Sequence, residues 1–129
     1  MPVSIRRKTY APVSDRRALL TEHAVGDGIG CTLTASAFTG KPGVVDGVVP
    51  AMYPVVVSAA GAATPFTGTA GTPGPLSGFT LNAVDISNGD DVTGYMWHGA
   101  LDPTLLPVPF DPAGVNTASA PRFYFNGKA

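Results

Sequence analysis

Proton transfer needs an imidazole or carboxylate held beside a second titratable group, and one stretch of this sequence gathers such residues. His98 follows a cluster of bulky side chains, and Asp85, Asp90 and Asp91 come shortly before it. A carboxylate–imidazole pair of this kind can act as an acid–base catalyst. Asp90 and Asp91, however, directly follow an Asn-Gly step, where aspartate is favoured for turn geometry alone. His23 is the only other histidine, and the pattern predicts no catalytic site.

The sequence also matches the known metal-binding and phosphate-binding motifs poorly. Residues 85–91 (DISNGDD) loosely resemble a calcium loop, but Asp90 stands where the loop needs glycine and Met96 where it needs glutamate. At most a weak accidental cation site remains. The glycine-rich residues 26–30 lack the Lys-Ser/Thr of a phosphate loop, and Cys31 has no basic partner that would activate a thiolate. We expect no metal, no cofactor and no enzymatic activity.

The composition favours a small, mainly β domain. The 129 residues include 16 glycines and 13 prolines, which are the two poorest helix formers. The charged share of 13% is about half of the usual value. Apolar runs are interrupted at Pro54 and Ser58 and are too short to cross a bilayer. The basic N-terminus is not followed by the apolar stretch of a signal peptide. We therefore expect a protein made in the cytoplasm, without a membrane partner.

Residues 1–28 are predicted to form an N-terminal arm on a β-rich domain of residues 29–129. Residues 1–17 hold five of the eight basic residues, whereas residues 18–121 hold eight acids and one lysine. A basic arm on an acidic body fits a protein partner better than nucleic acid, because the body would repel phosphates. The arm is either extended and ordered by a partner, or helical over residues 14–23.

Period-two patterns and turn residues predict several short strands. Residues 31–38 alternate small apolar residues with Ser or Thr, which is typical of a strand. Residues 44–49 place two valine pairs about an Asp-Gly step, as in a tight hairpin or a bulged strand. The three valines at 55–57 indicate a buried strand. Residues 61–78, rich in Gly, Thr and Pro, form either a solvated loop or a loop lying on a partner subunit.

The clearest local structure lies in residues 79–107. A strand, an Asn-Gly turn at residues 88–89, and a second strand follow one another. Three consecutive bulky residues at 95–97 load both faces of that second strand, so it is covered on both sides by a core or by an interface. An Asp-Pro step at 102–103 then predicts the start of a short helix. The aromatic residues 123–125 predict a final strand that pairs into a sheet or an interface.

Four short motifs after Val48 occur in a recognisable order. They are VPAMYPVV at residues 49–56, AVD at 83–85, GYMWHGA at 94–100 and DPTLLP at 102–107. In their order and spacing they resemble the lambda-type head decoration proteins of tailed bacteriophages, over about half of the chain. The resemblance is to a Pro-Ala-Met-x-Pro lead into the first core strand, a small-apolar-Asp strand, an aromatic strand ending in glycine, and an acidic turn into a Pro-closed helix.

The resemblance implies a virion protein on the outside of the capsid. It implies homotrimers that occupy threefold positions, bind the major capsid protein and stabilise the shell against internal pressure. It also implies N-terminal arms that order against the capsid by strand addition. The strand-like residues 31–38 and the long loop at 61–78 depart from the family pattern, which bears on how the N-terminal region docks.

We therefore expect a mainly β fold of the β-rich α+β kind. It would be a small β-sandwich or tulip-like domain with one or two short helices and an extended arm. The predicted capsid-binding residues of the arm are Ile5, Arg6, Arg7, Lys8, Tyr10, Arg16 and Arg17. The predicted subunit-interface residues are Tyr53, Phe66, Tyr95, Trp97, Leu105, Leu106, Phe123 and Phe125. The alternatives are another small phage structural protein, such as a tail-tube or head-completion protein, and a nucleic-acid-binding module that uses the basic arm.

Overall fold

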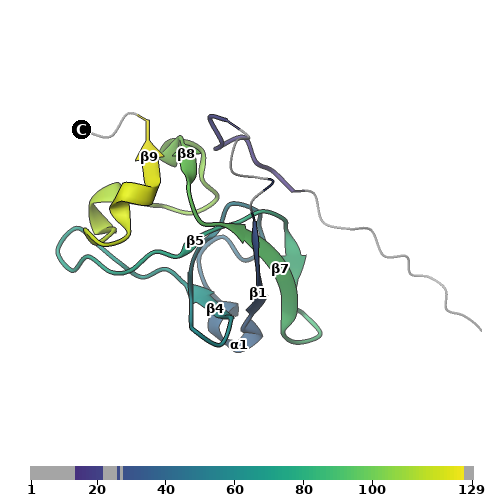
Figure 1. The fold of residues 1–129 in the computed structure, drawn as a ribbon. Helices are drawn as coiled ribbons and strands as arrows, with labels where there is room; N and C mark the ends of the chain where they lie inside the picture. The colour runs from purple at the N-terminus through teal and green to yellow at the C-terminus, as the bar shows by residue number, and fades with distance from the viewer. Residues whose placement is uncertain (1–13, 22–25, 27, 127–129) are drawn as a thin grey trace, which may run out of the picture.

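The computed structural model describes residues 14–21, 26 and 28–126, and its main element is a five-stranded closed barrel (Figure 1). The mainly β class with only short helices is confirmed. The strands close into a barrel where the sequence predicted a sandwich, because β1 pairs on one side with β7 and on the other with β4. In order around the barrel, the strands are β1 (Ile29–Leu33), β4 (Ala62–Pro65), β3 (Pro54–Val57), β5 (Gly78–Thr80) and β7 (Asp91–Met96).

The two strands of the predicted 79–107 hairpin are present as β5 and β7. They pair antiparallel, with Phe79 opposite Met96 and Thr80 opposite Tyr95. The predicted turn lies between them, where the Gly89 N–H donates to the Ile86 carbonyl at 3.1 Å. Trp97 comes directly after the end of β7, so the strand is one residue shorter than predicted.

The predicted strand at residues 31–38 is only half correct. Its first residues belong to β1, but the chain then forms a single helical turn, α1 (Ala35–Phe38). Phe38 is fully buried and its ring meets the edge of Tyr53 with a centroid distance of 5.5 Å. The helix is capped from the turn that precedes β7, because the Asp90 carboxylate accepts the Ala35 N–H at 2.8 Å. An alternating pattern of small residues does not reveal such a distant cap.

A two-stranded sheet of β2 (Val48–Val49) and β6 (Val84–Asp85) lies beside the barrel. The chain reaches β2 through the Asp46-Gly47 step, whose φ values are 54° and 76°. Two residues with positive φ between the mutually bonded Val45 and Val48 form a tight hairpin turn. The tight hairpin is therefore the correct one of the two predicted alternatives.

The predicted loop at residues 61–78 is partly regular. Its first residues form β4, which completes the barrel. The remainder crosses to the C-terminal region, where Gly74 forms a parallel bridge with Val115. The Gly74 N–H donates to the Gly114 carbonyl at 2.9 Å, and Gly74 accepts the Asn116 N–H at the same distance. This loop thus packs on its own chain.

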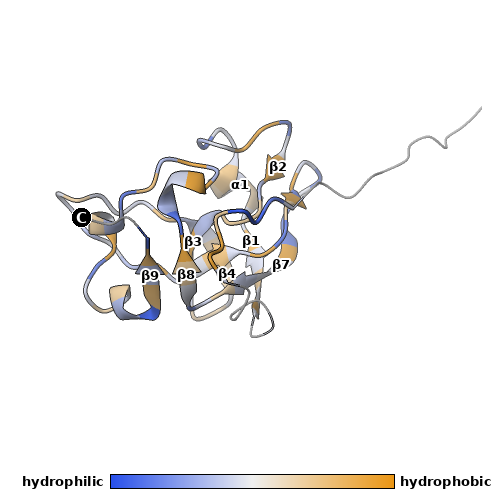
Figure 2. Ribbon diagram, turned by 90° about the horizontal axis from the view of Figure 1, so that it is seen from above, coloured by the Kyte–Doolittle hydropathy of each residue, from blue (hydrophilic) through white to orange (hydrophobic). Residues whose placement is uncertain are grey.

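A third small sheet stands to one side of the barrel in both ribbon views (Figures 1 and 2). Its strands β8 (Gly99–Leu101) and β9 (Phe123–Phe125) pair in parallel, which confirms the predicted pairing of the final strand into a sheet. Between them lie three 3-10 helices, η2 (Pro103–Leu105), η3 (Pro112–Gly114) and η4 (Ala120–Arg122). The first begins as predicted, with the Asp102 carboxylate accepting the Thr104 N–H at 3.0 Å.

The barrel wall separates two buried clusters. Leu33, Val55 and Ala63 belong to the cluster that α1 also joins. Phe79 and Met96 belong to the other cluster, which the C-terminal segment covers. In β7, Tyr95 packs against the first cluster and Met96 lies in the second, because successive residues of a strand face opposite sides.

Candidate interaction surface

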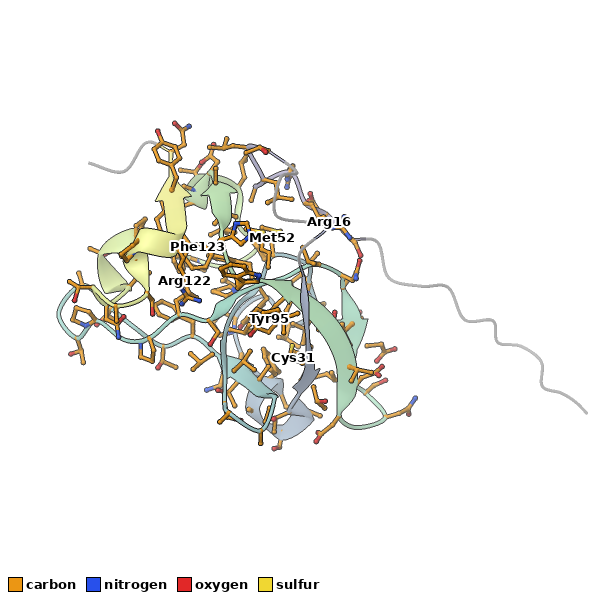
Figure 3. All side chains as sticks on the ribbon, in the orientation of Figure 1. Arg16, Cys31, Met52, Tyr95, Arg122 and Phe123 are labelled. Atoms are coloured by element: carbon orange, nitrogen blue, oxygen red, sulfur yellow. The ribbon has the colours of Figure 1, made fainter. Side chains whose placement is uncertain are left out.

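Residues 14–21 of the predicted arm lie against the body of the same chain. Arg16 donates from Nε to the Leu81 carbonyl at 2.6 Å and from Nη2 to the Asn82 side chain at 2.7 Å (Figure 3). The Ala83 N–H donates to the Ser14 hydroxyl at 3.0 Å. Ala18 is fully buried in the cluster around Phe79. These contacts belong to the domain itself, which begins at least as early as residue 14.

Residues 14–21 contain no helix, so of the two alternatives for residues 14–23 the helical one is wrong over the described part. Leu19 instead forms an isolated antiparallel bridge with Leu101, at the edge of the β8–β9 sheet. Arg17 remains exposed and forms an ion pair with Asp15 at 3.1 Å. Of the other predicted arm residues, Ile5, Arg6, Arg7, Lys8 and Tyr10 lie outside the described residues, as does His23.

Four of the predicted subunit-interface residues are buried within this chain. Tyr53 is 3% exposed and its hydroxyl donates to the Pro42 carbonyl at 2.8 Å. Leu106, Phe123 and Phe125 belong to the core cluster around Phe79 and are less than one tenth exposed. Their bulk fills this chain's own interior, so the prediction of an interface role is corrected for all four.

The other four candidates divide into two pairs. Phe66 and Tyr95 are half-buried against the two cores, whereas Trp97 and Leu105 are exposed by 36% and 43%. The three bulky residues at 95–97 therefore have different surroundings. Tyr95 and Met96 pack against the chain's own two core clusters on opposite sides of β7, and Trp97 is the exposed residue of the three.

The structure reveals an exposed apolar row that sequence reasoning missed. Leu20 and Tyr124 lie on either side of Ala100 in β8, as the Leu20 N–H bond to the Ala100 carbonyl and the β8–β9 register show. Leu20 is 45% exposed and Tyr124 is 61% exposed. We call these three residues the small-sheet row. The alternation Phe-Tyr-Phe in β9 was the available signal, because the middle side chain must face away from the other two.

A hollow of about 380 Å³ lies on the same sheet. Arg122 takes part in its lining, and its guanidinium donates to the backbone carbonyls of Leu76 and Ser77. These bonds fix the side chain beside η4. The lining residues are Thr21, Gly99, Ala100, Pro121, Arg122, Phe123 and Tyr124.

A second hollow of about 330 Å³ lies between the barrel and the C-terminal segment. Its lining is mainly proline and aromatic, with Lys41 and Asp111 as the charged members. The rings of Phe66 and Phe110 form part of it and lie 5.5 Å apart. Apolar walls with few polar groups suit binding better than catalysis.

Cys31, Asp85 and His98 were the residues considered for catalysis or metal binding, and the structure shows the surroundings of each. Burial raises the pKa of the Cys31 thiol, which disfavours the reactive thiolate. Hydrogen bonds from the Ser87 hydroxyl and backbone N–H hold the pKa of Asp85 below its usual value. The His98 ring lies 4.2 Å from that of Trp97. Within the described ranges, no three His, Cys, Asp or Glu side chains gather as a metal site would require.

No helix in the described part of the chain is long and apolar enough to cross a membrane. Comparison of the chain with protein-family models, with curated proteins and with solved structures found no match.

Proposed function

We propose that this protein is a phage head decoration protein that binds the outer surface of the mature capsid and stabilises it. In this proposal it acts as a homotrimer at threefold positions, with the major capsid protein as its partner. The proposal is supported by the order and spacing of the four motifs between residues 49 and 107. The alternative of a nucleic-acid-binding module is weaker, because Arg16, one of its five basic residues, is engaged by a carbonyl and an amide of the body.

The main structural support for the proposal is that one segment, residues 14–20, connects the basic arm to the exposed apolar small-sheet row. Residues 14–20 are anchored through Arg16, and their last residue, Leu20, is part of the small-sheet row. The arm therefore leaves the body from a fixed point, and a partner that holds the arm is brought close to the row.

Such a two-part surface suits attachment to a lattice. Residues 1–13 span about 43 Å if fully extended, at about 3.3 Å per residue, which is enough to reach a neighbouring molecule. A segment that orders only on binding gains modest affinity per contact. A second contact on the same molecule raises the effective concentration of the first, so two weak contacts give firm attachment.

Co-sedimentation with expanded empty phage heads tests the proposal, and light scattering measures the oligomeric state. We expect the full chain to co-sediment and deletion of residues 1–13 to weaken binding strongly, while the anchored residues 14–21 keep the body folded. Leu20→Ser with Tyr124→Ser should also weaken binding. Val45→Ser is the control, since Val45 is an apolar residue that is 65% exposed and lies near a different sheet.

Absence of binding by the full-length folded protein to heads of its own phage would overturn the proposal. Binding to duplex DNA that falls steeply with salt, without binding to heads, would support the nucleic-acid alternative instead.

A further inference from the structure

The Asn-Gly turn between β6 and β7 has a feature that capsid binding does not explain. Asn88 and Gly89 are both exposed. Gly89 has a φ of 125°, and an added Cβ would meet no atom within 4 Å. The turn therefore stands clear of the body, and the backbone after Asn88 has no side chain that would hinder attack by its own nitrogen.

The side chain of Asn88 differs from those of Asn82 and Asn116, which are both held by hydrogen bonds. Asn82 is held by Arg16 at 2.7 Å, and Asn116 is held by the Ser119 N–H at 3.0 Å. The Asn88 amide makes no hydrogen bond with the described part of the chain. One backbone bond opposes the reaction considered below, that from the Gly89 N–H to the Ile86 carbonyl.

We propose that Asn88 is a site of spontaneous deamidation. The Gly89 nitrogen attacks the side-chain carbonyl carbon of Asn88, its proton is lost, and ammonia leaves as a cyclic succinimide forms. Water then opens either carbonyl of the ring, giving aspartate or isoaspartate at position 88. The only co-reactant is water, and no oxidant or reductant is needed.

The structure also indicates what the modification changes. Isoaspartate routes the backbone through the former side chain and lengthens the turn two residues before Asp90. Asp90 caps α1 by accepting the Ala35 N–H. Modification at position 88 should therefore loosen the cap of α1, the turn that places Phe38 in the barrel core. It also adds a carboxylate beside Asp85, Asp90 and Asp91 in the sequence.

The test is incubation of the folded protein at mildly alkaline pH, followed by peptide mapping and isoaspartyl methyltransferase labelling. We expect the peptide containing Asn88 to gain the mass difference between an amide and an acid. The rate should be about fivefold below that of the denatured chain, because one ordinary hydrogen bond must open first. Asn82 and Asn116 in the same sample should stay unmodified.

The proposal is overturned if Asn88 stays intact in the folded protein while the denatured chain converts. It is also overturned if Asn82 and Asn116 convert as fast as Asn88. Asn88→Gln should abolish labelling of this peptide, and Asn126, which also precedes a glycine, is measured on its own peptide.

The effect on α1 is tested by amide exchange at Ala35 in aged protein. Exchange should be faster than in Asn88→Gln aged in parallel. Freshly prepared Asn88→Asp adds the charge without lengthening the backbone, so it should resemble the unaged protein. Equal exchange in aged protein and Asn88→Gln would refute the coupling between the turn and the helix.

Discussion

Replacing Arg16 by alanine should release residues 14–21 from the body while the barrel stays folded. The guanidinium makes one bond to the carbonyl of Leu81, whose side chain is 6% exposed, and a second bond to Asn82 on the surface. Arg16 is thus the main side-chain anchor of the segment, in addition to the backbone bonds that Ala18 and Leu20 make with Asp102 and Ala100.

The size of the effect follows from these two bonds. A hydrogen bond to a charged group contributes about 1.5–3 kcal/mol when it is shielded from water. The bond to Asn82 is exposed and adds about 0.5 kcal/mol. We take about 2–3 kcal/mol for the pair, which corresponds to a roughly 30- to 150-fold rise in the open population of the segment.

Amide hydrogen exchange measures this opening directly. The Leu20 N–H donates to the Ala100 carbonyl at 3.1 Å, and the Asp102 N–H donates to the Ala18 carbonyl at 2.7 Å. Both amides should exchange about 30- to 150-fold faster in Arg16→Ala. The Thr80 amide, which donates to Tyr53 within the barrel region, should keep its rate.

Arg17→Ala is the matched control. The Arg17–Asp15 ion pair is exposed at both ends, so its loss should change exchange by no more than a few-fold. Unchanged exchange at Leu20 and Asp102 in Arg16→Ala would refute the anchoring argument. An equal rise at Thr80 would also refute it, because it would show global rather than local opening.

Three further outcomes are expected. Asp90→Ala removes the cap on the Ala35 N–H and should lower the free energy of unfolding by about 1 kcal/mol in denaturant titration; no change would disprove the capping role. Phe79→Ala leaves a cavity at a fully buried site and should lower the free energy of unfolding by about 3–5 kcal/mol. Tyr124→Ala should lower it by less than about 0.5 kcal/mol. Similar losses for the two variants would contradict the burial of Phe79 and the exposure of Tyr124. The raised pKa of Cys31 means that its contribution to stability is present below the thiol pKa of the unfolded chain and declines as pH rises toward the folded value. Cys31→Ala should therefore show a smaller alkaline loss of stability than the unmutated protein.

Several local features could be predicted because a few adjacent residues decide them. The Asn-Gly turn at 88–89, the Asp-Gly hairpin at 46–47 and the Asp-Pro helix start at 102–103 were all placed correctly, although the second was predicted with an alternative. In each, the backbone conformation and the first hydrogen bond depend on neighbours within four positions. The mainly β class could be predicted from the high content of glycine and proline, which are poor helix formers.

Four of the eight predicted interface residues were wrong for a different reason. A sequence shows that Phe123 and Phe125 are apolar, but not whether a partner or the same chain covers them. Here the covering residue is Phe79, more than forty positions away, with ring centroids at 5.4 and 6.4 Å. Tyr124, between the two, was not chosen as a candidate although it is the exposed member of its strand.

The sequence by itself determined the class of the fold, its turns and the basic character of the first seventeen residues. Only the tertiary structure decided that the main sheet closes, that Asp90 caps a helix fifty-five positions earlier, and that Arg16 fastens its segment to the body. It alone brought Leu20, Ala100 and Tyr124 into one exposed row. The physical reason is that turn geometry is local, whereas burial and pairing depend on residues that meet only when the whole chain is folded.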